Sequence, residues 1–188
     1  MEKQDQNIAA QGEFLPGTDV IYSIHGKCNV VGTEYRMLGG ESIRFYKLEV
    51  KKSALSRSTR HESAIWVPVA SAKGLGLRIP MTQSDAEEAL KILKNREYYF
   101  KTNEPWSLVQ PKLEQCIRQE GGIGLAKVES FLFVLKRKQI VPTPEVSKFQ
   151  ETIHKLLFRE LAEALHEPAR ALEDKVAKGL RSKLIPDN

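Results

Sequence analysis

His25 and Cys28 stand close together in the stretch "HGKC", where their types and spacing could supply metal ligands or a base and a nucleophile. A structural zinc ion takes four such ligands, and the other histidines and the second cysteine lie far away in the sequence. A catalytic thiol needs a base within hydrogen-bond reach, but in a strand-like segment such a pair usually serves packing or a turn. We therefore expect no metal, no cofactor and no enzymatic activity, and we rank a hydrolase that uses Cys28 and His25 last.

Trp106, in the stretch "TNEPWSLVQPKLEQCIRQ", is a candidate for a binding site and not for catalysis. It shares a helical face with Val109 and Leu113, so it can anchor the start of a helix in the core. Alternatively, Pro105 and Pro111 stiffen the backbone around an exposed ring that inserts at a base step of the DNA minor groove. Basic residues that could meet phosphates are Lys112, Arg118, Lys136, Arg137 and Lys138.

Composition limits the class of protein. The 188 residues include 29 lysines and arginines against 24 aspartates and glutamates, a formal net charge of +5. This balance permits polyanion binding without demanding it. Two cysteines far apart favour free thiols in a reducing cytoplasm, and no apolar run reaches the length of a membrane span. We expect a cytoplasmic protein that does not contact membranes.

The N-terminal part has the pattern of strands and turns. From about residue 17 to 79, β-branched and aromatic runs alternate with glycines, which predicts five short strands in a strongly bent sheet or barrel. "LGGES" predicts a tight hairpin. The preceding "TEYRML" is a candidate edge for a partner, with Arg36 supplying charge and Met37 and Leu38 apolar contact; the alternative is a plain solvent-facing edge. The segment 51–63 reads as an exposed basic loop.

After Thr82 the pattern becomes helical. "SDAE" predicts a capping box between Ser84 and Glu87. Four further helices are expected: 106–119, ended by "EGGIG"; 125–138; one from "VPTPE" to 165; and one opened by Pro168. The predicted fold is therefore α+β, with a disordered tail over 1–13, a sheet domain over 14–82 and an all-α bundle of about five helices over 83–188.

Several motifs follow one another in order along this framework: Gly17, Tyr22, His25 with Gly26, the hairpin, Phe45 with Tyr46, Val67 with Pro68, and "GLR" at 76–78. A tryptophan after a short polar linker and the helix "LLFRELAEAL" complete the series. In their order and spacing they resemble the CarD family of bacterial transcription regulators, over about residues 14 to 180.

This resemblance implies a Tudor-like N-terminal domain that binds the RNA polymerase β subunit, as does the similar domain of transcription-repair coupling factor. It also implies a helical domain whose tryptophan, here Trp106, wedges into the minor groove of promoter DNA and stabilises the open complex. The family's basic polymerase-contacting position falls on Arg36, and a second such position falls on Trp66. We expect a monomer that reaches the nucleoid through polymerase.

The residues after the tryptophan depart from the family pattern. Close relatives carry arginines there that meet DNA, whereas this chain has "SLVQ" at 107–110. Each lost phosphate contact lowers affinity and salt dependence. The departure favours an alternative function, an adaptor that binds polymerase or another protein and no longer touches DNA.

Overall fold

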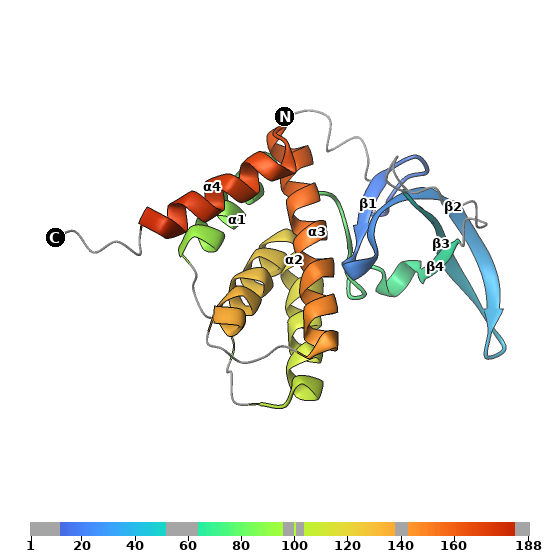
Figure 1. Cartoon of the computed structure of the whole chain (residues 1–188). Helices are drawn as coiled ribbons and strands as arrows, with labels where there is room; N and C mark the ends of the chain where they lie inside the picture. The colour runs from blue at the N-terminus through green and yellow to red at the C-terminus, as the bar shows by residue number, and fades with distance from the viewer. Residues whose placement is uncertain (1–11, 52–63, 96–99, 101–103, 138–142, 183–188) are drawn as a thin grey trace. The chain divides into compact units, whose positions relative to one another are not determined.

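The computed structural model describes residues 12–51, 64–95, 100, 104–137 and 143–182. The fold is α+β, with strands preceding helices along the chain (Figure 1). The chain divides into two units, Met1–Ile79 and Pro80–Asn188, whereas the sequence predicts the division between 82 and 83. Most of the predicted tail and the basic loop lie outside the described residues, but Glu13 is described and pairs with Arg44 at 3.0 Å.

The first unit is a five-stranded antiparallel sheet with the order β4-β3-β2-β1-β5. Its strands are β1 (Asp19–Tyr22), β2 (Gly26–Leu38), β3 (Glu41–Val50), β4 (Ile65–Pro68) and β5 (Leu77–Arg78). The number of strands agrees with the prediction. Within the described residues, however, β4 does not pair with β5, so the sheet is open and the Tudor-like barrel is not confirmed.

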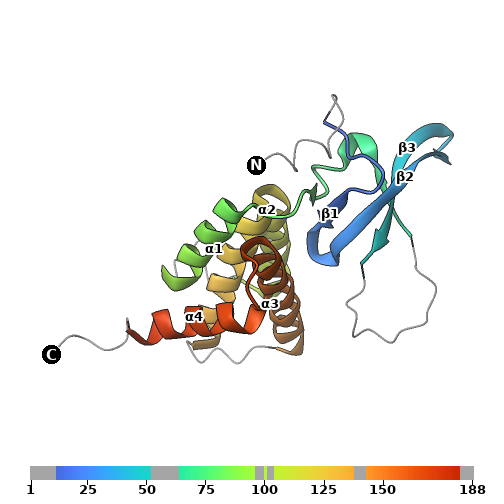
Figure 2. The same cartoon turned by 90° about the horizontal axis from the view of Figure 1, so that it is seen from above.

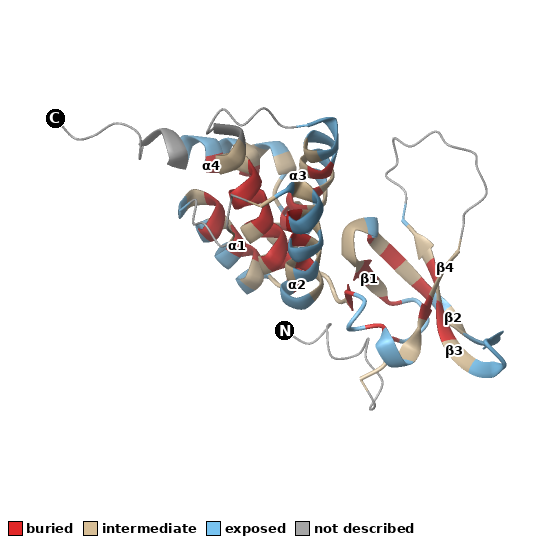
Figure 3. Ribbon diagram, turned by 90° about the horizontal axis from the view of Figure 1, so that it is seen from below, coloured by how far each residue is buried: buried red, intermediate tan, exposed pale blue. Residues whose placement is uncertain are grey.

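Buried residues of the strands, red in Figure 3, form a hydrophobic core, and the strand register places them on one face of the sheet. Val30, Tyr46, Leu48 and Val67 are all at most 2% exposed there. The Tyr46 hydroxyl also accepts a hydrogen bond from the backbone N–H of Phe14 at 3.0 Å, which ties the segment before β1 to the core.

The predicted hairpin is confirmed and joins β2 to β3. Leu38 pairs with Glu41 across a turn made by Gly39 and Gly40, whose φ angles are 62° and 88°. A two-residue hairpin turn with positive φ at both positions matches the twist of antiparallel strands, and glycine adopts it without strain. Closer to the core, the pairing of β2 shifts between Val30 and Gly32, so Val31 forms a β-bulge.

Within its described residues the second unit contains four helices, not the five expected: α1 (Gln83–Asn95), α2 (Trp106–Arg137), α3 (Pro144–Leu165) and α4 (Ala169–Ser182). The two helices expected over 106–119 and 125–138 are one element, α2, which changes direction at Gly121 (φ 60°, ψ −125°). A Cβ on Gly124 would lie 2.5 Å from the Cys116 carbonyl oxygen. Gly121 is not helical, so α2 consists of two helical segments that meet at a sharp bend with no longer loop between them, and the predicted break at "EGGIG" is confirmed (Figure 2).

The first helix is capped two residues earlier than predicted. The Thr82 hydroxyl accepts a hydrogen bond from the Asp85 N–H, and the Asp85 carboxylate accepts one from the Thr82 N–H, both at 3.1 Å. This reciprocal pair is the capping box, so the assignment to Ser84 and Glu87 is wrong. Asp85 takes the role because its short carboxylate also lies at the positive end of the helix dipole.

Three helices of the bundle meet at His154 of α3. Its Nδ1 lies 2.9 Å from Oε1 of Glu129 in α2, and its Nε2 lies 3.3 Å from Oε1 of Glu173 in α4. Glu129 is 5% exposed, and its Oε2 has no hydrogen-bond partner in the described structure. These carboxylates, Glu129 foremost through its hydrogen bond, raise the pKa of His154 above its ordinary value of 6.5, against the opposing effect of burial.

Candidate functional site

The outer end of the β2–β3 hairpin is the most exposed apolar feature that the structure describes. β1 pairs with residues 26–29 of β2, and β4 pairs with residues 45–48 of β3. In the part of the chain that the structure describes, the outer parts of β2 and β3 therefore pair only with each other. Tyr35, Met37 and Leu38 are 71%, 70% and 60% exposed, and the pale blue hairpin end in Figure 3 shows this exposure. Large apolar side chains gathered at one exposed place indicate an interaction site.

Strand register places Arg36 and Trp66 on the same face of this hairpin. Lys47 is opposite Trp66, Phe45 is opposite Glu34, and side chains alternate between faces along each strand. Arg36 and Trp66 therefore both project from the face of Lys47. The Arg36 Cζ lies 3.4 Å from the centroid of the Trp66 ring, and the Lys47 Nζ lies 5.7 Å from it.

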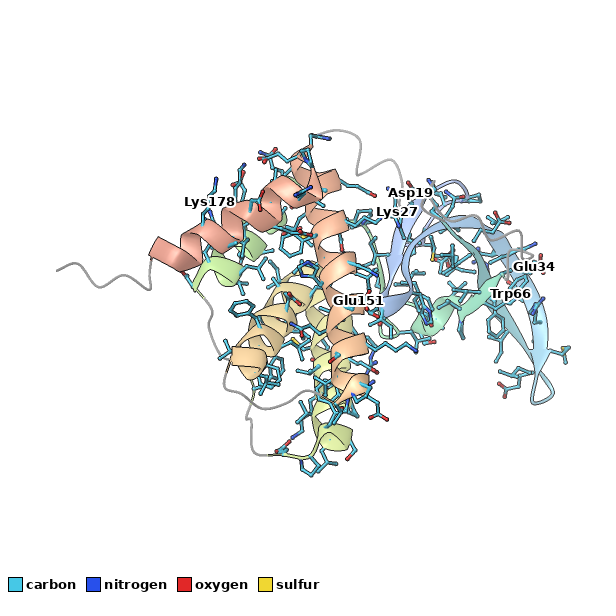
Figure 4. The ribbon with its side chains drawn as sticks, viewed as in Figure 1. Asp19, Lys27, Glu34, Trp66, Glu151 and Lys178 are labelled. Atoms are coloured by element: carbon cyan, nitrogen blue, oxygen red, sulfur yellow. The ribbon has the colours of Figure 1, made fainter. Side chains whose placement is uncertain are left out.

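The charges on this face are open to a partner. Within the described residues, neither Arg36 nor Lys47 forms an ion pair, whereas Arg44 on the opposite face bonds to Thr33 and Glu13. Glu34, which is labelled in Figure 4 and shares the face of Trp66, also forms no ion pair among the described residues. A cation with free N–H donors beside exposed apolar side chains has the composition of an interface hot spot.

Of the four residues predicted to bind polymerase, the structure brings Arg36 and Trp66 into contact. Arg36, Leu38 and Trp66 share one face, and Met37 projects from the other. Sequence reasoning missed Tyr35, which lies on the face of Met37 and is 71% exposed. The alternation within "TEYRML" is the signal that could have found it. We call Tyr35, Arg36, Met37, Leu38 and Trp66 the hairpin surface.

Trp106 begins α2 and is half-buried. Its ring packs edge-on against Phe149 of α3, with the centroids 5.6 Å apart. Its Nε1 is buried without a hydrogen-bond partner in the described structure. The contact is that of a helix-start anchor, yet the ring is not enclosed. Two residues further on, Leu108 is 57% exposed.

The basic residues predicted to bind DNA are either paired or outside the described part. Lys112 pairs with Glu104, and Arg118 lies 3.7 Å from Glu114. Of the cluster at 136–138, the side chains of Lys136 and Arg137 and the whole of Lys138 lie outside the described residues. No uncompensated cationic group accompanies Trp106 among the predicted residues whose side chains are described.

The pair His25 and Cys28 does not have the geometry of a nucleophile site. The Cys28 thiol is buried and donates to the Gly26 carbonyl at 3.6 Å, and burial raises its pKa to about 11. The His25 ring instead stacks on Tyr22, with the centroids 5.0 Å apart. A thiol held protonated at neutral pH is a poor nucleophile and metal ligand.

The described residues offer neither a metal site nor a membrane-spanning helix. No three His, Cys, Asp or Glu side chains among them are placed to bind a metal ion. None of their helices combines the length and apolarity needed to cross a bilayer. Comparison with known proteins gives no further assignment: no family model matches the chain, and no relative was found among curated proteins.

Proposed function

We propose that this protein is a non-enzymatic, cytoplasmic transcription regulator that docks on the β subunit of bacterial RNA polymerase through the hairpin surface. The observation that carries the proposal is the stack of Arg36 on Trp66 beside exposed apolar side chains. These are the positions at which the resemblance to CarD regulators expects polymerase contact.

The composition of the hairpin surface supports a protein partner. Tyrosine, tryptophan and arginine are the residues that most often dominate binding energy at protein interfaces. The outer hairpin also has free strand edges, where the backbone of a partner can add hydrogen bonds. Tyr35 and Met37 on one face, with Arg36 and Leu38 on the other, allow a partner to contact both sides.

In the full form of the proposal, the helical unit reaches promoter DNA and Trp106 contacts the minor groove of the open complex. Its ring at the start of α2 is only partly buried, which supports this role. Inserting a wedge at one base step costs about a few kcal/mol of unstacking, and tethering to polymerase helps to offset this cost because it raises the effective concentration of the ring. Stabilising the open complex ten- or a hundredfold relative to the closed complex needs only about 1.4 kcal/mol for each factor of ten.

A second candidate is an adaptor that binds polymerase, or another protein, without touching DNA. The ion pairs of Lys112 with Glu104 and of Arg118 with Glu114 favour it, because a phosphate would have to compete with a carboxylate already in place. The buried Nε1 of Trp106 favours it too, since that N–H faces the protein and not a base edge.

One experiment separates these functions. Binding of the full chain to core RNA polymerase is measured for the wild type and Arg36→Ala, and open-complex lifetime is measured for the wild type and Trp106→Ala. The regulator predicts that Arg36→Ala loses polymerase and that Trp106→Ala shortens the lifetime while polymerase binding persists. Loss of binding in Arg36→Ala with an unchanged lifetime in Trp106→Ala supports the adaptor. A wild-type chain that does not bind polymerase contradicts the regulator.

A further inference from the structure

We propose that Trp66 is a positioning residue: its indole holds the Arg36 guanidinium so that the N–H edge of Arg36 meets a carboxylate of the docked protein. This inference rests on the proposed docking function and names the chemistry of the contact. In this role Trp66 orients the Arg36 side chain, and Trp66 itself does not need to contact the partner.

The distance fixes the orientation of the guanidinium. Arg36 Cζ is 3.4 Å from the Trp66 ring centroid, which is van der Waals contact between the central carbon and the ring. A guanidinium pointing an N–H group at the ring would hold Cζ further away. The flat face of Arg36 therefore lies on the indole, and its N–H donors, which all lie in the guanidinium plane, stay available.

The surroundings select an anionic group for those donors. Within the described residues no carboxylate pairs with Arg36, although Glu34, Glu41 and Glu49 project from the same face of the sheet. Lys47 lies 5.7 Å from the same ring and adds a second positive charge. Two cations beside one indole repel a further cation and attract a carboxylate, which can accept two parallel N–H bonds from arginine.

Stacking also reduces the entropic cost of docking. An exposed arginine loses rotamer freedom when a partner fixes it, and a side chain already held on a ring has less to lose. A cation–π contact at an exposed site supports an effect of about two- to fivefold on binding. Trp66 should then matter for affinity only while Arg36 is present.

The test is a double-mutant cycle on the full chain, with affinity for core RNA polymerase as the readout. The variants are Arg36→Ala, Trp66→Leu and the double variant. Trp66→Phe is the conservative substitution because it keeps an aromatic ring, whereas Trp66→Leu keeps only an apolar side chain. Lys47→Ala is the matched control for loss of one positive charge near the same ring.

We expect Trp66→Leu to weaken binding about two- to fivefold, Trp66→Phe to recover much of that loss, and the double variant to bind no worse than Arg36→Ala. NMR supplies a readout independent of polymerase: the Arg36 side-chain protons should show an upfield ring-current shift that Trp66→Leu abolishes and Trp66→Phe retains in part. If Trp66→Leu does not fold, the cycle is built with Trp66→Phe and Arg36→Ala.

The failures can be distinguished. If Arg36→Ala weakens binding but Trp66→Leu does not, or if their effects simply add, the positioning role is wrong and the docking site stands. If Arg36→Ala binds polymerase as the wild type does, the docking site and this inference both fail. Arg36 protons without a ring-current shift in the wild type would overturn the stack directly.

Discussion

Replacement of His154 by glutamine should destabilise the helical unit at pH 6 and do so much less at pH 8.5. Both ring nitrogens of His154 face carboxylate oxygens, at 2.9 Å on Glu129 and 3.3 Å on Glu173. Ionised carboxylates only accept hydrogen bonds, so both nitrogens must donate, and only the protonated imidazole can do this. The neutral glutamine amide cannot replace that charge.

The magnitude follows from burial. Breaking a fully buried ion pair costs about 3–5 kcal/mol, and breaking an exposed pair costs about 0–1 kcal/mol. The Glu129 side chain is 7% exposed and that of His154 is 40% exposed, so the loss at pH 6 should be about 2 kcal/mol. Since the Glu173 side chain is 43% exposed, its pair adds little. For a domain of about 100 residues, this lowers Tm by roughly 10 °C.

The pH dependence has a definite sign. The folded pKa of His154 is raised above 6.5, so the bridge contributes its full stability below the unfolded pKa. That contribution is lost as pH rises through the folded pKa. The difference between the wild type and His154→Gln should therefore shrink from pH 6 to pH 8.5.

Thermal unfolding followed by helical circular dichroism at several pH values gives the difference in Tm, and an NMR titration of the His154 ring gives its pKa directly. Glu173→Gln is the control, because removing the exposed carboxylate should cost less than about 1 kcal/mol and leave most of the pH dependence. A difference in Tm that stays constant from pH 6 to 8.5, or a His154 pKa at or below the ordinary value of 6.5, would refute the bridge.

Three further predictions concern packing. Gly124→Ala should destabilise the helical unit by about 1–3 kcal/mol in urea unfolding, because the new Cβ would lie 2.5 Å from a carbonyl oxygen. Gly32→Ala is the control: its new Cβ meets nothing within 4 Å, so urea unfolding should change little. Tyr46→Phe removes the acceptor of the Phe14 N–H and should cost about 1 kcal/mol and speed hydrogen exchange at that amide. Trp106→Phe should cost less than about 1.5 kcal/mol in thermal unfolding, since the lost N–H has no described partner; a larger loss would mean that this N–H is bonded in solution.

The local features of the fold could be predicted from the sequence. Adjacent glycines at 39 and 40 adopt backbone angles that favour a hairpin turn, and the β-branched runs around them are confirmed as strands. The bend in α2 shows the limit of local reasoning. Gly121 interrupts helical geometry as the glycine-rich motif predicts, but the sequence does not show that the two helical segments meet at a sharp bend with no longer loop between them.

The candidate site was predictable in composition but not in geometry. Arg36 and Trp66 are far apart in the sequence, and their contact depends on the pairing of β2 with β3 and of β3 with β4. Neither register is encoded by a local motif. The ion pair of Lys112 with Glu104 is likewise a matter of side-chain placement before and within α2, which residue types alone do not give.

The bulge at Val31 changes which residues of β2 face the core, from even-numbered positions before it to odd-numbered positions after it. Before it, the even-numbered Cys28 and Val30 point to the core; after it, the odd-numbered Thr33 lies opposite the core residue Tyr46. A mutational scan for stability along β2 should therefore find its sensitive positions at even numbers first and at an odd number afterwards. The one additional residue thereby turns Arg36, which strict alternation from Val30 would direct inward, to the outer face.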